Sequence, residues 1–177
     1  MATLPVHRLD AATYGRFVAT GELDGEPTEL LEGVICEMSP HAPAHATAIM
    51  RLTRYLGPAR AWLRIQLSLH VAGDSVPEPD LALVAEEPKS SEHPTTALFV
   101  VEVAVNSHPV DREIKAPLYA AAGIPIYWLI DIPGRAVEVR TGPTEDGYGR
   151  LDSYAPGASV PSPAAGVGPL DVTWLLA

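Results

Sequence analysis

One stretch of the chain, from Ala97 to Asp131, most constrains what the sequence can fold into. It opens with an apolar, mostly β-branched run, which is typical of a strand buried on both faces. A turn, a helix-like segment closed by Gly123, and a second apolar strand from Ile126 to Ile130 follow. The first strand also contains one carboxylate, Glu102. A strand–helix–strand unit with a charged residue inside its first strand indicates a site as well as packing.

Glu102 is costly in a buried strand unless a cation, a metal or hydrogen-bond donors receive its charge. A second acid, Asp80, follows Pro79 and opens a strand predicted for Leu81 to Ala85. If these two strands pair, both carboxylates could converge on one oxygen-ligated cation such as Mg²⁺. The structural alternatives are a cap at the start of the strand for Asp80, and an edge-facing or internally paired side chain for Glu102.

Asp111 and Lys115 lie four residues apart in the helix-like segment, where Lys115 can reach back toward the two acids. The chain contains ten arginines and only two lysines. Arginine does not readily give up its proton. A lysine at this position therefore suggests a catalytic role, either in proton transfer or as a cation that stabilises the transition state. The alternative is an exposed ion pair between Asp111 and Lys115, worth a few tenths of a kcal/mol.

The rest of the chain predicts an α/β (α+β) fold, with three successive strands before the crossover helix and hence a mixed sheet flanked by helices on both faces. With 177 residues, no internal repeat and no low-complexity linker, residues 1–177 are expected to form a single domain. The other predicted elements are a helix over Ala11 to Thr20 capped by Asp10, a hairpin within Glu29 to Met38, a loop over Ser39 to Pro43, a helix from about Ala44 to Leu56, a strand over Trp62 to Val71, a hairpin of Ala136 to Arg140 with Tyr148 to Tyr154, and a C-terminal segment, Val172 to Leu176, packed onto the body.

Composition places the chain among soluble globular proteins, with 47% hydrophobic and 19% charged residues. No apolar run approaches the ~20 residues that a membrane span needs. The N-terminus lacks the basic head and apolar stretch of a secretory signal, so a cytoplasmic location and no membrane association are expected. The single cysteine, Cys36, excludes an internal disulfide and a multi-cysteine zinc site.

The net charge of −10 argues against a large non-specific nucleic-acid footprint, which requires clustered lysine and arginine. It leaves open a local basic groove built from Arg51, Arg54, Arg60 and Arg64, or equally a solvated helix face and loop. A homodimer is also possible through an apolar face on the Tyr127-Trp128 strand and the terminal hairpin.

These residues together resemble a known family. Pro79-Asp80, Glu102-Val103, the D-x-x-x-K spacing of Asp111 and Lys115, and an aromatic residue, Tyr119, three positions before A-G-I-x-x-Y-W-L-I-D look like the PD-(D/E)XK nuclease superfamily, and within it the bacterial Uma-two branch. The resemblance runs from Glu29 to the C-terminal region. It implies a restriction-endonuclease-like core in α-β-β-β-α-β order, and an endonuclease that hydrolyses DNA with Mg²⁺ or Mn²⁺.

The resemblance also implies roles for particular residues. Asp80 and Glu102 would be metal ligands and Lys115 would assist catalysis. The superfamily's usual lysine is missing, because Ala104 stands two residues after Glu102, but the branch carries its lysine on the following helix. Two further residues correspond to the branch's motifs and would complete the pocket: Glu29, in Y-E-L-x-x-G, and His45, in M-S-P…H.

The chain departs from the family pattern at three places in these motifs. The family's S-P-S loop after Glu102-Val103 is looser here, where residues 105–109 read V-N-S-H-P. Thr28 replaces the tyrosine before Glu29, and Pro117 falls within the lysine-bearing helix. An interior proline costs a helix about 3 kcal/mol, so Pro117 would either start a shorter helix or kink this one and displace Lys115. For His45, the structural alternative is a capping or surface histidine.

Two other functions remain open on the sequence. The chain could be a nuclease-fold binding or assembly module without turnover, as its acidity and Pro117 allow. It could also be an unrelated α/β hydrolase acting on a small phosphorylated substrate.

Overall fold

A six-stranded mixed sheet forms the centre of the computed structural model, which describes residues 6–38, 42–71 and 73–177. The α/β class predicted from the sequence is confirmed. The strands lie in the sheet in their order along the chain: β3 (Trp62–Ile65), β4 (Leu81–Val84), β5 (Phe99–Ala104), β6 (Ile126–Asp131), β7 (Ala136–Thr144) and β8 (Gly147–Tyr154).

One parallel pair, β5 with β6, makes the sheet mixed. All other neighbours are antiparallel. A parallel pair needs a crossover connection, and here it consists of α3 (His108–Val110), a π-helical turn η1 (Asp111–Lys115) and α4 (Ala116–Ala121). Together with α2 (Pro43–Leu56), which precedes β3, this gives the α-β-β-β-α-β order expected from the sequence.

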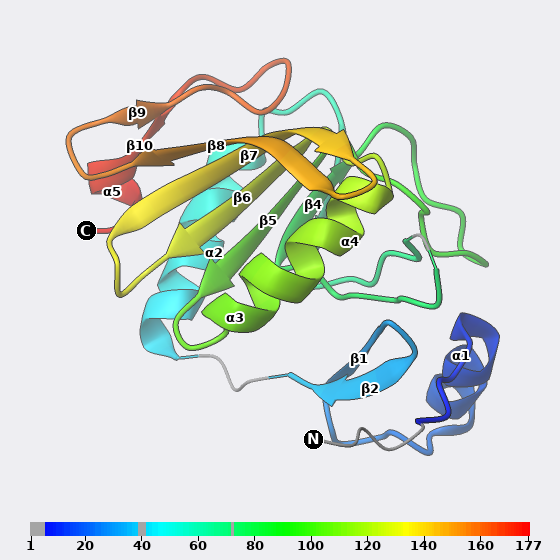
Figure 1. Ribbon diagram of the computed structural model, residues 1–177. Helices are drawn as coiled ribbons and strands as arrows, with labels where there is room; N and C mark the ends of the chain where they lie inside the picture. The colour runs from blue at the N-terminus through cyan, green and yellow to red at the C-terminus, as the bar shows by residue number, and fades with distance from the viewer. Residues whose placement is uncertain (1–5, 39–41, 72) are drawn as a thin grey trace.

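The two faces of the sheet are covered by different helices (Figure 1). On one face Leu52 and Leu56 of α2 pack against alternate strand residues such as Val101 and Trp128. On the other face Tyr119 of α4 packs against residues such as Tyr127. Val101 and Val103 of β5 point toward α2. Glu102 stands between them, so its side chain points to the opposite face, toward the crossover.

The N-terminal part lies below the sheet in Figure 1 and reaches it through a hairpin. Helix α1 (Ala11–Thr20) begins after Asp10, whose side chain accepts from the Thr13 amide as the sequence predicted. The hairpin strands β1 (Thr28–Leu31) and β2 (Val34–Glu37) follow. Leu30 and Val76 exchange backbone hydrogen bonds of 3.3 and 2.7 Å, which hold the hairpin against the segment before β4. This contact places Glu29 next to the sheet.

The predicted strand from Trp62 to Val71 is wrong in its second half, because β3 ends at Ile65. Gln66 has a left-handed backbone with φ of 49°, which an extended strand cannot contain. Its amide donates to the carbonyl of Asp80 at 2.9 Å, and the chain then leaves the sheet. Of the predicted loop Ser39 to Pro43, residues 39–41 lie outside the described residues.

The C-terminal segment packs onto the body as predicted. It forms β9 (Ser159–Val160), β10 (Leu170–Asp171) and α5 (Val172–Leu175), and Val172 and Leu175 are buried against the face that α2 covers. The apolar face expected from Tyr127 and Trp128 is not at the surface, because both side chains are buried inside the sheet layers. In the terminal hairpin Leu151 is exposed. No helix in the described part of the chain is long and apolar enough to cross a membrane.

Candidate metal centre and active site

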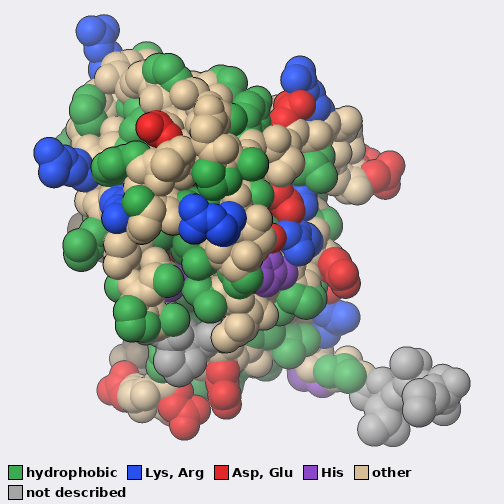
Figure 2. All heavy atoms as spheres, turned by 90° about the vertical axis from the view of Figure 1, so that its left-hand side faces the viewer, with side chains coloured by type: hydrophobic (Ala, Val, Ile, Leu, Met, Phe, Trp, Pro, Cys, Tyr) green, Lys and Arg blue, Asp and Glu red, His purple; other side chains and the backbone are tan. Residues whose placement is uncertain are grey.

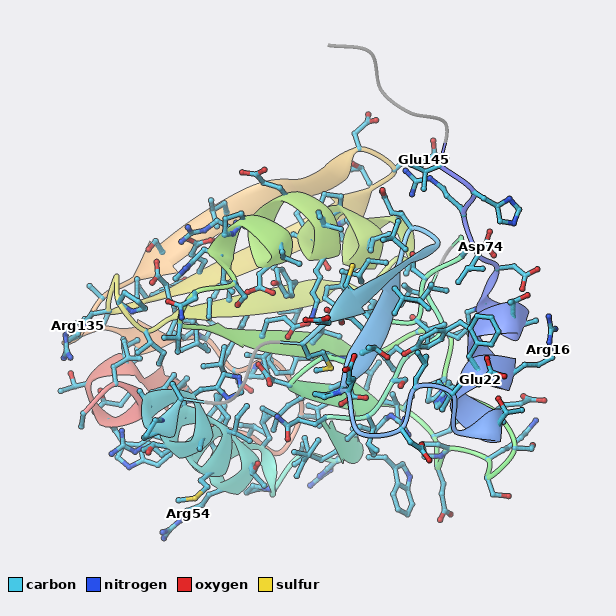
Figure 3. All side chains as sticks on the ribbon, turned by 90° about the horizontal axis from the view of Figure 1, so that it is seen from below. Arg16, Glu22, Arg54, Asp74, Arg135 and Glu145 are labelled. Carbon is cyan, nitrogen blue, oxygen red and sulfur yellow. The ribbon has the colours of Figure 1, made fainter. Side chains whose placement is uncertain are left out.

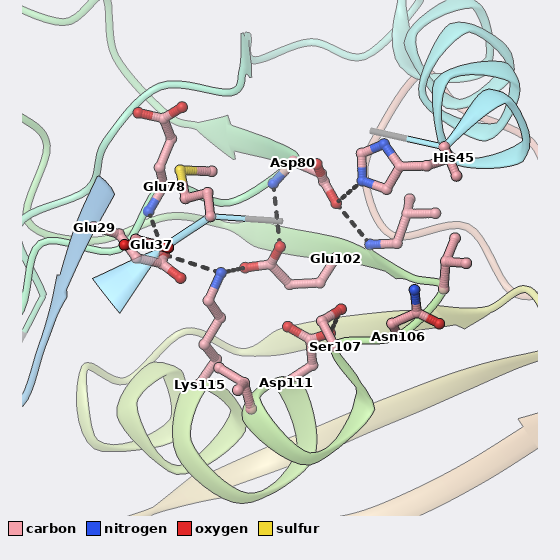
Figure 4. Close-up of a pocket in the computed structure, with 15 residues that line it drawn as sticks. Glu29, Glu37, His45, Glu78, Asp80, Glu102, Asn106, Ser107, Asp111 and Lys115 are labelled. Atoms are coloured by element: carbon pink, nitrogen blue, oxygen red, sulfur yellow. Dashed lines mark hydrogen bonds and ion pairs between the residues drawn. The ribbon is translucent and has the colours of Figure 1, made fainter. Parts of the chain in front are cut away.

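An acidic pocket opens where the N-terminal hairpin, α2, the ends of β4 and β5, and the crossover meet (Figure 4). Its cavity has a volume of about 240 Å³. All five residues that the sequence predicted for the site line this pocket: Glu29, His45, Asp80, Glu102 and Lys115. The structure therefore brings together residues that are up to 86 positions apart, from Glu29 to Lys115.

Lys115 lies between two carboxylates. Its Nζ is 3.0 Å from Glu29 Oε2 and 3.1 Å from Glu102 Oε1. Burial lowers the pKa of Lys115, but the charges of Glu102 and Glu29 outweigh burial and leave this pKa well above its ordinary value. The two carboxylates thus favour the charged ammonium form of Lys115 in this pocket.

An exposed ion pair of Asp111 with Lys115 is the wrong interpretation, because these residues are only 3% and 5% exposed. Pro117 does not displace Lys115 from the pocket. Proline has no amide hydrogen, and Pro117 lies in the first turn of α4, directly after the π-helical turn in which the Ala116 amide donates to the Asp111 carbonyl. Asp111 accepts from Ser107 Oγ at 2.5 Å, and burial raises the pKa of this carboxyl.

Glu102 uses its two oxygens differently. Its Oε1 accepts from Lys115 Nζ and from the Tyr119 hydroxyl at 2.7 Å, while its Oε2 lies 3.4 Å from the Asp80 amide. Glu102 is therefore internally paired, as its structural alternative predicted, but the pairing takes place inside the pocket. Burial, together with Asp80 and only partly offset by Lys115, raises the pKa of Glu102 well above its ordinary value.

The Asp80 side chain contacts both β5 and α2. Its Oδ2 accepts from the Val103 amide at 2.8 Å and lies 3.1 Å from His45 Nε2. Because the carboxylate contacts the neighbouring strand, it is not a cap for the start of its own strand. His45 is 8% exposed and the N-cap position of α2 belongs to Ala42, so His45 is neither a surface nor a capping histidine.

The charges of this pocket are unbalanced. Among the described lining residues four acids are buried, Glu29, Asp80, Glu102 and Asp111, and Lys115 is the buried ammonium beside them. Unpaired buried carboxylates are unfavourable unless a cation joins them. The carboxylate oxygens of these acids are ligands that fit a hard divalent cation such as Mg²⁺ or Mn²⁺.

Within the described residues, no three histidine, cysteine, aspartate or glutamate side chains form a ready-made metal cluster. The protein would thus contribute the neighbouring carboxylates of Asp80 and Glu102. This fits Mg²⁺, which is usually bound through one or two carboxylates and keeps several waters.

Two of the four arginines that could form a basic groove donate to separate parts of the backbone. Arg51 donates to the carbonyls of Leu175 and Ala177, and Arg64 donates to that of Ser68. Arg54 points outward from α2 (Figure 3). Figure 2 shows lysine and arginine side chains separated from one another by hydrophobic and other groups on the face it displays.

Tyr119 contacts the site through Glu102, and the sequence did not single it out as a functional residue. The motifs include it only as an aromatic position in the family pattern, yet its hydroxyl donates directly to Glu102. Its position four residues after Lys115 was the available signal, because residues at this spacing share one face of a helix.

The topology of the sheet and the buried acid–lysine cluster define a nuclease-like fold. The Uma2 family, described as "Putative restriction endonuclease", matches residues 13–172, and the chain belongs to this family. A crystal structure from Anabaena variabilis ATCC 29413, described as "a putative nuclease belonging to DUF820", is similar with a TM-score of 0.69 and 17% sequence identity, over 85% of this chain and 90% of that one. Comparison with curated proteins gives no significant match. The family resemblance inferred from the motifs is thus confirmed.

Proposed function

We propose that the protein is a divalent-metal-dependent endonuclease that hydrolyses DNA phosphodiester bonds. The observation that carries this proposal is the position of Lys115, held between Glu29 and Glu102 beside Asp80 in a pocket with excess negative charge. Membership of a family described as "Putative restriction endonuclease" supports nucleic acid as the substrate. A structural ion pair alone would not need the further buried acids.

In this proposal Asp80 and Glu102 would hold Mg²⁺ or Mn²⁺, and the bound ion would supply Lewis-acid stabilisation of the phosphate and a more acidic water. Lys115 places a permanent positive charge where the phosphorane charge develops. Glu29 orients Lys115 by accepting from its ammonium. His45 holds the Asp80 carboxylate through Nε2. The raised pKa of Lys115 makes it an electrostatic group, so it is not assigned the role of general base.

Purified protein is expected to nick DNA with Mg²⁺ or Mn²⁺ and not with EDTA. Asp80→Ala and Glu102→Ala are each expected to abolish cleavage, while Asp152→Ala, on the exposed Arg150–Asp152 pair of β8, leaves it unchanged. Plasmid nicking and circular dichroism would be measured for each variant. Metal-dependent cleavage that survives both site substitutions would discard the assignment.

A nuclease-fold binding or assembly module is the second candidate. The net charge of −10 and the dispersed basic side chains of Figure 2 favour it, because duplex DNA binding depends on clustered cations. Metal titration separates the two functions, since a module that has lost turnover is expected to lack a divalent-ion site of useful affinity. Homodimer formation stays a prediction, with the exposed Leu151 on β8 as its apolar contact.

A further inference from the structure

We propose that Tyr119 is a positioning residue, whose hydroxyl fixes the Glu102 carboxylate so that one oxygen is occupied within the protein and the other is presented for the metal ion. This inference rests on the proposed function, because it concerns the same metal centre. It assigns a role to a side chain that the sequence motifs left as an aromatic position.

The two oxygens of Glu102 differ in how strongly the protein engages them. Oε1 receives the Tyr119 hydroxyl at 2.7 Å and the Lys115 ammonium at 3.1 Å. Two donors fill the usual capacity of one carboxylate oxygen. Oε2 has only a long contact, 3.4 Å, from the amide of Asp80. The free coordination capacity of Glu102 is therefore on the side of Asp80.

Tyr119 is suited to hold this orientation. The terminal torsion of a glutamate is broad and nearly two-fold, so packing alone does not decide which oxygen faces which partner. The Tyr119 side chain is fully buried, and its ring lies 5.3 Å from that of Tyr127. A rigid ring thus delivers one fixed hydrogen bond to Glu102.

Lys115 cannot provide this orientation alone. Its ammonium is shared with Glu29, and its three donors can rotate about a flexible stem. The Tyr119 hydroxyl approaches from the same crossover, four residues further along the chain. Loss of the hydroxyl would let Glu102 turn and offer both oxygens to Lys115, which competes with the metal ion.

The protein contains a matched control. Tyr127 is also fully buried and is the ring neighbour of Tyr119, but its hydroxyl donates to the backbone carbonyl of Asp111 at 3.2 Å. Tyr119→Phe and Tyr127→Phe each remove one buried hydroxyl from the same cluster. Only the first removes a donor from Glu102.

The test is Mn²⁺ binding by isothermal titration calorimetry to the full chain and the two variants. Loss of an outer hydrogen-bond partner of a ligand typically weakens metal binding about 10–100-fold, and this is expected for Tyr119→Phe. Tyr127→Phe is expected to keep the wild-type affinity. In DNA cleavage at saturating Mn²⁺, Tyr119→Phe should lower kcat and leave the KM for DNA near its wild-type value. Equal metal affinities for the two variants would overturn the proposal.

Two further measurements keep the outcomes distinct. If Tyr119→Phe does not fold, 4-aminophenylalanine at position 119 can be tested, because it retains the ring and a hydrogen-bond donor. Wild-type Mn²⁺ affinity is expected for this variant. An affinity as low as that measured for Glu102→Ala would contradict the inference. Wild-type protein that binds Mn²⁺ but cleaves no DNA would refute the endonuclease activity alone, and the comparison of the two phenylalanine variants would still decide the role of Tyr119. Wild-type protein that binds no Mn²⁺ would refute both.

Discussion

Two charge clusters flank the crossover, and they are built differently. The first is the acidic pocket around Lys115. The second, here named the β6–β7 network, consists of His108, Arg112, Asp131, Glu138 and Arg140. In this network Arg112 donates to Asp131 at 2.9 Å and to Glu138 at 2.7 Å, Arg140 donates to the other oxygen of Glu138 at 2.7 Å, and His108 Nε2 lies 2.8 Å from Asp131.

The β6–β7 network balances its own charge, and the pocket does not. Burial raises the pKa of Asp131, but the Gly134 amide, His108 and Arg112 outweigh burial and lower this pKa below its ordinary value. In the pocket, burial raises the pKa of Glu102 and of Asp111. Ion pairing therefore does not by itself mark a site in this protein. The excess of buried carboxylate does, because among the residues that the structure describes it leaves negative charge in the pocket that Lys115 does not balance.

The largest expected difference between the clusters is in the free energy of unfolding that is lost when the basic side chain of each, Lys115 or Arg112, is replaced. Lys115→Met leaves Glu29 and Glu102 buried without their partner, and breaking a buried pair in this way costs about 3–5 kcal/mol. Arg112→Met is expected to cost about 1 kcal/mol, because the Arg112 side chain is 36% exposed and each acid keeps another donor. Urea denaturation at pH 7 measures both values. Equal losses would show that the pocket is an ordinary structural ion pair.

The second largest expected difference between the clusters is in the Tm shift caused by a divalent cation. A ligand that binds only the folded state at 100 times its Kd stabilises by about 2.7 kcal/mol. Mg²⁺ or Mn²⁺ is expected to raise the Tm of the wild type, and Asp80→Asn is expected to remove the shift, while Asp131→Asn keeps it. Thermal unfolding with and without EDTA gives the result. A Tm shift that disappears in Asp131→Asn and persists in Asp80→Asn would place the ion at the wrong cluster.

The residues that line the pocket could be picked out from the sequence because each of them stands out from its immediate neighbours in the chain. Glu102 stands out as a charge within an apolar strand, and Asp80 as an acid at the start of the strand before it, so the chemistry of each could be inferred without coordinates. The sheet and its crossover followed from apolar periodicity and the order of elements. The roles of these residues as metal ligands and catalytic groups stay predictions.

Other features depend on packing that no local pattern encodes. Strand β3 ends at a left-handed backbone at Gln66. The sequence could not predict this conformation, because glutamine rarely adopts it. The Tyr119 hydroxyl donates to Glu102 from the crossover, just after the π-helical turn, and a spacing of four residues does not by itself predict which partner it finds. Pro117 was expected to shorten or kink the helix, and only the structure shows that Lys115 keeps its place beside it.

The pH dependence of stability should differ in sign between the clusters, and this is the smallest expected effect. The pKa of Asp111 is raised in the folded state, so its contribution favours folding at low pH and is lost as pH rises through the folded pKa. Asp111→Asn cannot ionise and keeps an acceptor for Ser107, and it should therefore be more stable than the wild type at neutral pH. The lowered pKa of Asp131 predicts the opposite: Asp131→Asn should be less stable at neutral pH, with the difference vanishing as pH falls through the pKa of the folded carboxyl. Urea denaturation of both variants at several pH values tests this, and differences of the same sign at neutral pH would contradict the contrast between an unbalanced pocket and a balanced network.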